Sequence, residues 1–257
     1  HGVRGGLVAG LLFILPGVVV MLALSLIYAT LGAVPLVAAL FFGLKCAVLV
    51  LVVEALLRVA RKALHGALPW LVAALAFLAL FVFNLPFPLV ILAAGLLGYA
   101  LPQAFAAGGH GKPAEGPPAL LDAAIAADPA RIPGMARQAR RAGLVALVLW
   151  LWPVALLMGT PLWGDIAFFF SKMAVVTFGG AYAVLAYVAQ EAVEKYQWLT
   201  AADMLAGLGL AETTPGPLIL VLQFVAFLAG WKEGGALAAI GASILAVWVT
   251  FAPCFAW

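Results

Sequence analysis

A lysine and a glycine pair lie close together inside one of the most apolar stretches of the chain. Lys172 is followed six residues on by Phe178, and then by Gly179 and Gly180. A lysine inside a membrane span costs about 2.5–3.5 kcal/mol on insertion scales, so its presence calls for a reason. Either the glycines unwind the helix, and their amide N–H groups form an anion site with the lysine, or the lysine extends to the interface and the glycines admit a neighbouring helix. Both interpretations are open at this point.

The stretch GLGLAETTPGPLI contains a second interruption, at Pro215, Gly216 and Pro217. The two prolines remove backbone donors, so no ordinary helix continues through them. Irregular backbone at membrane depth is tolerated where it lines a cavity or is buried in protein. We therefore expect a discontinuous span in which Thr214 and the Pro-Gly-Pro segment contact a substrate and Glu212 couples protons. The alternative is a loop at the membrane interface.

Lys45 lies near the middle of a third apolar stretch, FFGLKCAVLVLVVEALLRVARKAL. Glu54, nine residues on, is about half a turn out of phase with it, and is expected to pair with Arg58 at i, i+4. Lys45 therefore needs a partner on another element, either a carboxylate or an anionic substrate. An ionisable residue inside a membrane span is by default a functional candidate.

The composition indicates what kind of elements must position these residues. The 257 residues are 67% hydrophobic and only 9% charged, with a mean hydropathy of +1.20, whereas soluble proteins are about half apolar and about a quarter charged. The apolar runs are continuous rather than alternating, so we expect an all-α, polytopic helical membrane protein. Cys46, Cys254 and the three histidines show no metal-ligand spacing, and no Walker or dinucleotide-binding glycine pattern occurs. We therefore expect no metal, no cofactor and no nucleic-acid partner, and neither an ATP-driven pump nor a membrane metalloenzyme.

Eight apolar segments have about the length of a helical span. Between residues 103 and 141 the composition changes to glycine, proline and charge, which is typical of a surface linker. We therefore expect a first membrane half over residues 1–102, a linker over 103–141, and a second membrane half over 142–257. The segments are 7–31, 34–57, 67–83, 86–102, 142–160, 166–189, 204–229 and 234–257.

Basic residues predict the orientation of the spans. The cluster Arg58–Lys62 follows the second segment, and five more lysines and arginines lie in the linker. Both regions should be cytoplasmic by the positive-inside rule. Counting spans from there places Asp165 and Trp231–Glu233 outside and Glu191–Lys195 inside.

A short similarity relates the two halves. Arg4–Gly6 precedes the first segment and Glu233–Gly235 precedes the last, and each is a charged residue followed by two glycines. One would enter the membrane from inside and the other from outside, as in the inverted-topology repeats of secondary transporters. The chain begins without methionine, and nothing in the first half matches the two segments that precede Glu233. We expect the first half to be incomplete at its start.

Taken together, these motifs resemble the chromate transporter family, which pairs an FGG motif with a downstream PGP motif. The stretch FGGAYAVLAYVAQEAVEKYQWLTAADMLAGLGLAETTPGPLI is similar to the signature region of that family's second half. HGVRGGLVAGLLFILPG resembles the segment after the first half's own PGP motif, and the stretch around Lys45 resembles the next span. FPLVILAAGLLGYALP also fits, so the resemblance covers nearly the whole chain outside the linker.

The resemblance implies two inverted-topology halves in the cell's inner (plasma) membrane, joined by a cytoplasmic linker. It also implies export of chromate from the cytoplasm, which lowers internal chromate, gives chromate resistance and draws on the proton-motive force. Many members carry a further glycine and a histidine after FGG, where this chain has Ala181 and Tyr182, so no role is transferred to these two. We assign proton coupling to Glu212 and substrate binding to Lys45, Lys172, Phe178, Gly179, Gly180, Thr214, Pro215, Gly216 and Pro217.

Alternative functions are separated by what each would require. A transporter of sulfate or another tetrahedral oxyanion stays open, because sulfate and chromate share shape and charge. A membrane enzyme or scaffold would require a cluster of catalytic carboxylates, serines or histidines, which we do not find in the sequence. A channel is disfavoured, because a repeat broken by glycine and proline is typical of transporters. A homodimer is left open.

Overall fold

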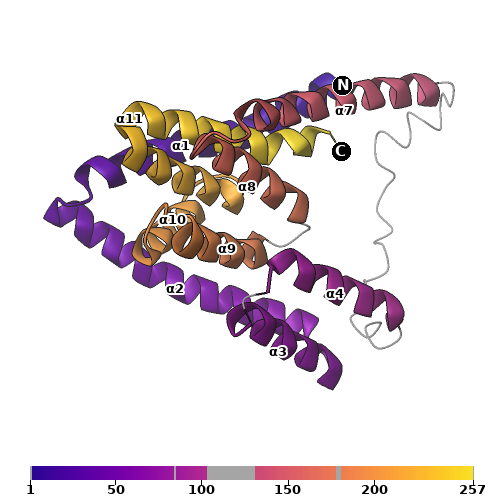
Figure 1. Ribbon diagram of the computed structural model, residues 1–257, viewed down its shortest axis with the longest axis horizontal. Coiled ribbons are helices and arrows are strands. Elements are labelled where there is room, and N and C mark those ends of the chain that lie inside the picture. Colours follow the sequence, from indigo (N-terminus) through magenta and orange to yellow (C-terminus); the bar gives the residue numbers. More distant parts are fainter. Residues whose placement is uncertain (1, 84, 103–130, 178–180, 257) are drawn as a thin grey trace. The chain divides into compact units, whose positions relative to one another are not determined.

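The computed structural model describes residues 2–83, 85–102, 131–177 and 181–256, and these residues are helical with short connections. Contacts divide the chain into two compact units, residues 1–49 with 123–257, and residues 50–122. The expected all-helical architecture is therefore confirmed. The α-helices are α1 (Gly2–Leu31), α2 (Pro35–Ala63), α3 (Ala67–Phe81), α4 (Phe87–Ala100), α7 (Arg131–Leu157), α8 (Trp163–Val176), α9 (Ala181–Gln190), α10 (Ala201–Thr213) and α11 (Val221–Phe251), as Figure 1 shows.

The surface of these helices is apolar in a way that only lipid can cover. Leu12 on α1 is 67% exposed and Leu36 on α2 is 72% exposed, although soluble proteins rarely expose large contiguous apolar patches. Within the described residues, four helical stretches are long and apolar enough to cross a membrane. These observations agree with a polytopic membrane protein. The four stretches are α1, α2, Ile132–Leu157 of α7, and Leu218–Phe255, which includes α11.

The second unit consists of the end of α2 with the short helices α3 and α4. The two short helices contact each other, and the amide of Leu85 donates to the carbonyl of Ala79 in their connection, at 2.9 Å. The two helices thus form a tight hairpin. On α2, Arg58 pairs with Glu54 at 2.6 Å, as the i, i+4 spacing predicts.

In the first unit, α8 and α9 form a hairpin that doubles back. Near the middle of the pair, Lys172 of α8 lies against Tyr187 of α9. Nearer the start of α8, the ring of Phe169 lies 5.4 Å from the ring of Tyr196, which follows α9 and the single π-helical turn Glu191–Lys195. Lys172 contacts Tyr187, and the earlier residue Phe169 lies near the later residue Tyr196. The two helices are therefore antiparallel. Segment 166–189 is therefore two half-length helices rather than one crossing helix.

The next segment forms a second hairpin, from α10 and the first arm of α11. Gly207 of α10 packs directly against the ring of Phe224 on α11. At the open end of the hairpin, Lys232 Nζ donates to the carbonyl of Gln197 at 3.4 Å. A 3-10 turn (Leu218–Leu220) leads from the break into α11.

Helix α11 itself folds back at its glycine pair. Gly234 and Gly235 have non-helical backbone angles, with φ of −152° and +69°. A Cβ atom at Gly230 would lie 2.5 Å from the carbonyl oxygen of Ala238, so the two arms lie against each other with no room for a side chain. Figure 1 shows this turn in α11. The arm after the turn corresponds to the last predicted segment, 234–257, which is thus separate from 204–229.

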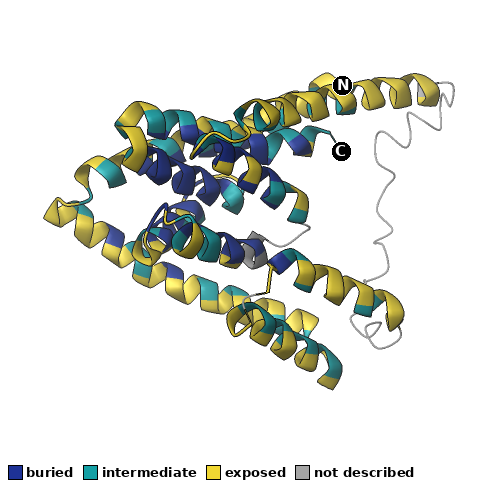
Figure 2. Ribbon diagram, viewed as in Figure 1, coloured by how far each residue is buried: buried dark blue, intermediate teal, exposed yellow. Residues whose placement is uncertain are grey.

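The largest buried side chains of the first unit belong to these hairpins and to α1. Figure 2 shows the buried residues concentrated in the central helices and the exposed ones along α2 and the start of α7. The core of the first unit is therefore made by the broken segments together with α1. The fully buried side chains include Met21, Ile166, Phe169, Phe170, Met173, Phe224 and Phe227.

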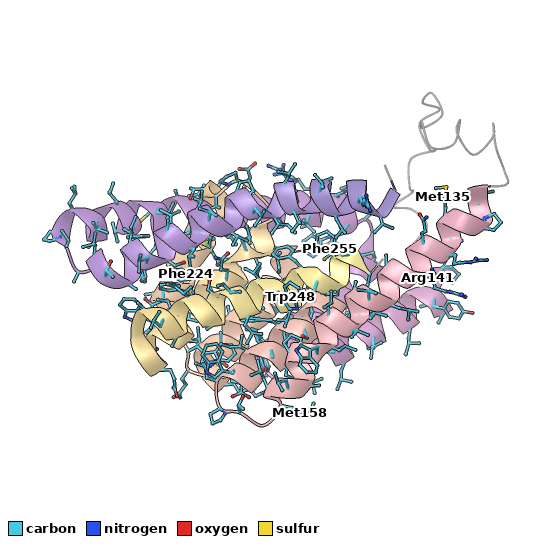
Figure 3. All side chains as sticks on the ribbon, turned by 90° about the horizontal axis from the view of Figure 1, so that it is seen from above. Met135, Arg141, Met158, Phe224, Trp248 and Phe255 are labelled. Atoms are coloured by element: carbon cyan, nitrogen blue, oxygen red, sulfur yellow. The ribbon has the colours of Figure 1, made fainter. Side chains whose placement is uncertain are left out.

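Two ends of the first unit differ in charge. One end joins the starts of α1 and α7, because Gly2 and Val3 line one groove with Met135 and Gln138. Figure 3 shows Arg141 and Met158 toward opposite ends of α7. The basic residues at or near the joined starts are Arg4, Arg137, Arg140 and Arg141.

The opposite end of the first unit holds the start of α8, the end of α9, the start of α10 and the turn of α11 at Gly234 and Gly235. Five carboxylates and two lysines lie there, for a net charge of −3. The span count expected Asp165 and Glu191–Lys195 on opposite sides of the membrane, whereas α8 and α9 bring them to the same end of the first unit. The count failed because it treated two hairpins as crossing helices. By the positive-inside rule we expect the basic end to be the cytoplasmic one, and this stays a prediction. The charged residues are Asp165, Glu191, Glu194, Lys195, Asp203, Lys232 and Glu233.

Helix α7 begins at Arg131, within the range predicted to be linker. Pro133 does not prevent this, because proline is tolerated in the first turn of a helix. The rest of the predicted linker, residues 103–130, lies outside the described residues.

Candidate functional site

The first break follows α8. This helix ends at Val176, and Thr177 has non-helical angles with ψ of +81°. Its amide and its hydroxyl both donate to the carbonyl of Met173, which closes the end of the helix. The chain resumes as α9 at Ala181. The predicted site residues Phe178, Gly179 and Gly180 lie outside the described residues.

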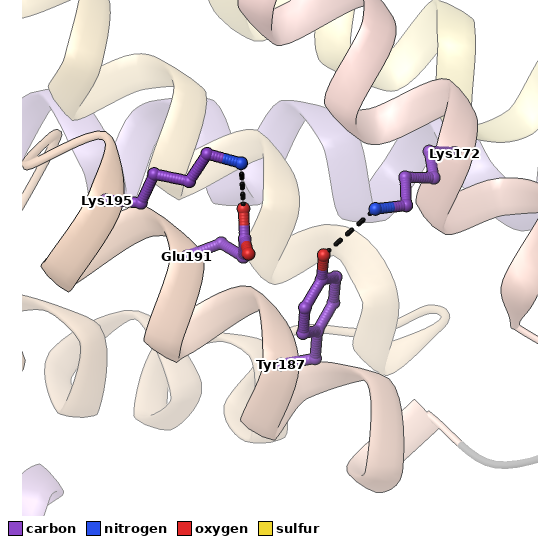
Figure 4. Close-up of polar contacts among 4 residues, drawn as sticks. All are labelled: Lys172, Tyr187, Glu191 and Lys195. Carbon is purple, nitrogen blue, oxygen red and sulfur yellow. Dashed lines mark hydrogen bonds and ion pairs between the residues drawn. The ribbon is translucent and has the colours of Figure 1, made fainter. Parts of the chain in front are cut away.

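Lys172 lies on α8, half-buried, little more than one turn before this break. Its Nζ donates a hydrogen bond to Tyr187 Oη at 3.0 Å, and lies 5.3 Å from the centre of the Tyr187 ring (Figure 4). The lysine therefore reaches across the hairpin to a neutral acceptor, and no ion pair of Lys172 occurs within the described ranges. A lysine ammonium group has three N–H donors, of which Tyr187 takes one.

Tyr187 was missed by the sequence reasoning. Its side chain is only 6% exposed and its ring lies 6.1 Å from that of Phe169, so the hydroxyl is fixed by packing as well as by the lysine. The sequence did contain a signal for Tyr187. It lies 15 residues after Lys172, on the other side of the helix break, and two such residues lie opposite each other when the segment doubles back. The signal was not used, because the segment was taken to be a single span.

The second break follows α10. Thr214 is extended, and Gly216 has φ of +129°, a backbone region that favours glycine. The hydroxyls of Thr213 and Thr214 both donate to the carbonyl of Leu210, at 3.1 and 2.6 Å. These bonds satisfy a carbonyl at the end of α10 that has no helical partner.

This arrangement limits what the second break can offer a ligand. Pro215 and Pro217 have no N–H, so the backbone donors near the break are the amides of Thr214, Gly216 and Leu218. Glu212 lies half-buried in the last turn of α10, two residues before Thr214. The break therefore combines a few amide donors with a carboxylate.

Elements that flank the two breaks contact each other within the first unit. Helix α9 begins immediately after the first break, and it contacts the 3-10 turn Leu218–Leu220 that follows the second. Helix α1 contacts the same turn. The turn that follows the second break therefore lies against both α9 and α1, and the prediction that Lys172 and the second break form two halves of one site stays a prediction.

Lys45 lies on α2 beside α10. The side chains of Leu44 and Val48 pack against Gly209, where a Cβ atom would lie 2.6 Å from Leu44 Cγ. Lys45 is half-buried, and over the described parts of the chain it forms no hydrogen bond or ion pair. It is therefore an unpaired cation about one turn below the end of α10, and its role in binding stays a prediction.

The open ends of the hairpins are fastened by polar contacts. Tyr28 of α1 donates to Asp203 Oδ1 at 2.6 Å, and Asp203 also forms a capping box with Thr200 at the start of α10. Thr200 is thus the N-cap of α10. In the π-helical turn, Lys195 pairs with Glu191 at 2.8 Å (Figure 4), and this hydrogen bond raises the pKa of Lys195 above its ordinary value.

The chemistry of the site is that of binding a small anion. Lysine side chains supply charge, and the start of α9 supplies the positive end of a helix. No group of three or more histidine, cysteine or carboxylate side chains able to hold a metal occurs among the described residues. The arrangement resembles the discontinuous helices of secondary transporters, in which half-helix ends meet near the middle of the membrane.

Comparison with known proteins identifies the family. The chain matches the chromate transporter family over residues 1–99 and 164–257. It is 32% identical, over 99% of its length, to the chromate transport protein of Pseudomonas aeruginosa and 23% identical, over 99%, to that of Cupriavidus metallidurans. It covers 55% of each relative, so the chain spans about half the length of these curated proteins. No solved structure matches it. The match extends over both sides of the predicted linker, and the chain belongs to the chromate transporter family.

Proposed function

We propose that the protein containing this chain is a secondary transporter that exports chromate from the cytoplasm across the plasma membrane and so confers chromate resistance. The observation that carries the proposal is Lys172, a charged and half-buried ammonium group held by Tyr187 beside a helix break. A cation kept at such a position in a membrane protein is costly unless an anion uses it. The family match and the names of the relatives support chromate as that anion.

The proposed site is formed around the two breaks. Lys172 and Lys45 supply two positive charges for a dianion, and the Thr214–Pro217 break supplies amide donors. The start of α9 adds the positive end of its helix, which favours anions. Phe178, Gly179 and Gly180, which lie outside the described residues, belong to the proposed site by their place in the FGG motif. Within this proposal the basic end of the first unit and the linker are cytoplasmic, and the hairpins open toward the opposite face.

Glu212 is the proposed proton-coupling group. It is a half-buried carboxylate in the last turn of α10, beside the break, which is the position from which a proton-carrying group could act on a bound anion. Glu212→Gln is expected to abolish the pH dependence of uptake while leaving binding of the oxyanion. Full, pH-dependent uptake by this variant would exclude the role.

The test uses everted membrane vesicles, in which export appears as uptake of chromate. Lys172→Met should lower uptake at subsaturating chromate at least tenfold. The matched control is Lys195→Met, because Lys195 lies on the same hairpin with its side chain 62% exposed at the open end, and it should transport normally. Equal uptake by the Lys172 variant and the parent would refute the site. Competition by sulfate then shows whether the site distinguishes the two tetrahedral dianions.

A further inference from the structure

The middle of α1 carries a proline and a glycine that face the second break. Pro16 lies inside the helix and has no N–H, so one carbonyl of the preceding turn lacks its helical donor. Gly17, which follows, is buried. A Cβ atom at Gly17 would lie 2.5 Å from the carbonyl oxygen of Pro215 and 2.5 Å from Leu220 Cδ1. No side chain fits there unless the break moves.

From the other side, Gly216 is in van der Waals contact with α1. A Cβ atom at Gly216 would lie 3.7 Å from the Cα of Gly17, 3.7 Å from the carbonyl oxygen of Phe13 and 3.3 Å from Leu220 Cδ1. Two glycines from segments about 200 residues apart thus face each other across a backbone-to-backbone contact. The second break therefore lies directly on the backbone of α1.

A buried glutamine fixes the same pair of elements. Gln223, in the first turn of α11, is 1% exposed, and its Nε2 donates to the carbonyl of Val18 at 3.0 Å. Its Oε1 is buried and has no hydrogen-bond partner in the described part of the chain. A buried acceptor without a donor lowers the stability of the fold. An apolar side chain of the same size would fill this space without that free-energy penalty. The glutamine is better explained by its bond to Val18.

We propose that Gly17 and Gln223 are positioning residues that seat the Thr214–Pro217 break on α1. We call Pro16–Val18 the α1 seat. The seat fixes how far the break lies from Lys172 and so sets the geometry of the oxyanion site. The effect on transport rests on the proposed function, whereas the contact between break and seat does not.

The seat is tested first without transport. In the intact gene product with Cys46→Ser and Cys254→Ser, a cysteine is introduced as Thr213→Cys, at an exposed position next to the break. Adding Gly17→Ala should raise the rate of labelling by a membrane-permeant maleimide at least fivefold, because the added methyl displaces the break. Gly6→Ala is the matched control, since Gly6 lies on the same helix and a methyl group added there would meet no atom within 4 Å. This control should leave the labelling rate unchanged.

Transport then tests positioning. Gly17→Ala should raise the chromate concentration for half-maximal uptake about tenfold, with the maximal rate changed less than threefold. Gln223→Met removes only the hydrogen bond to Val18 and should raise the same concentration three- to fivefold. If the Gly17→Ala protein does not reach the membrane, Gln223→Met alone still tests the proposal. Leu220→Ala in the Gly17→Ala background removes one of the two clashing groups and should restore part of both readouts.

The outcomes separate the two proposals. Labelling rates and half-saturation values within twofold of the parent for both Gly17→Ala and Gln223→Met would overturn the α1 seat. The variants could be labelled faster than the parent protein although the parent protein itself does not take up chromate. That result would leave the seat standing and refute the proposed function. A change in maximal rate alone, with half-saturation unaltered, would also count against positioning.

Discussion

The hydrogen bond between Lys172 and Tyr187 makes the sharpest prediction about the proposed site. Tyr187→Phe removes the hydroxyl that accepts from Lys172 Nζ at 3.0 Å and keeps the ring that packs near Phe169. The ammonium group has three donors, so one bond to Tyr187 leaves two for an oxyanion. The hydroxyl thus orders the lysine before the anion arrives.

Two independent magnitudes apply to this variant. A hydrogen bond to a charged group contributes about 1.5–3 kcal/mol, and the half-exposure of Lys172 reduces that through solvent screening. Ordering a free lysine side chain costs up to about 2 kcal/mol. Both suggest a loss of about 1–2 kcal/mol of anion binding, which is about a 5- to 30-fold increase in the half-saturating chromate concentration. The maximal rate should change little.

The assay is a double-mutant cycle in everted vesicles. Tyr187→Phe, Lys172→Met and the double variant are compared for half-saturation, with the amount of protein in the membrane measured for each. If the tyrosine acts through the lysine, it has no further effect once Lys172 is methionine. The explanation fails if Tyr187→Phe has the same effect in both backgrounds, or if half-saturation changes less than twofold.

Further expectations concern orientation, capping and packing. Glu194→Cys in the protein with Cys46→Ser and Cys254→Ser should react with an impermeant maleimide added outside intact cells, whereas Arg141→Cys should react only after permeabilisation. The span count expected from hydropathy places both residues inside, and it predicts that neither reacts before permeabilisation. Thr200→Ala removes the capping box and should lower the free energy of unfolding by about 1 kcal/mol, measured by thermal unfolding in detergent. Gly230→Ala puts a methyl group 2.5 Å from the carbonyl oxygen of Ala238 and should cost about 1–3 kcal/mol in the same measurement.

Local sequence rules located most of the elements. The glycine pair at Gly234 and Gly235 and the prolines at Pro215 and Pro217 interrupt helices where backbone chemistry requires. Glu54–Arg58 pairs and Thr200 caps as their spacings predict. These predictions succeeded because each depends on residues within one or two turns of each other.

Contacts between distant segments were beyond these rules. Nothing local to Gly17 indicates that it faces Pro215, nearly 200 residues away, and nothing local to Tyr28 indicates Asp203 as its partner. Tyr187 was missed for a related reason, because its opposition to Lys172 depends on the direction in which the chain leaves the break. Only a three-dimensional arrangement supplies that direction.

The direction of the two hairpins is a case in which charge was more informative than hydropathy. A window of about 20 apolar residues cannot distinguish one spanning helix from two half-length helices, since both bury the same composition in lipid. The loops do differ, because a true crossing alternates sides and a hairpin does not. The rule counts lysines and arginines, and the end of the first unit with Arg4, Arg137, Arg140 and Arg141 holds more of them than the end with Lys195 and Lys232. We therefore expect the connection between the hairpins to lie outside, and in that orientation the second break, which contacts the middle of α1, would lie between the two faces of the membrane.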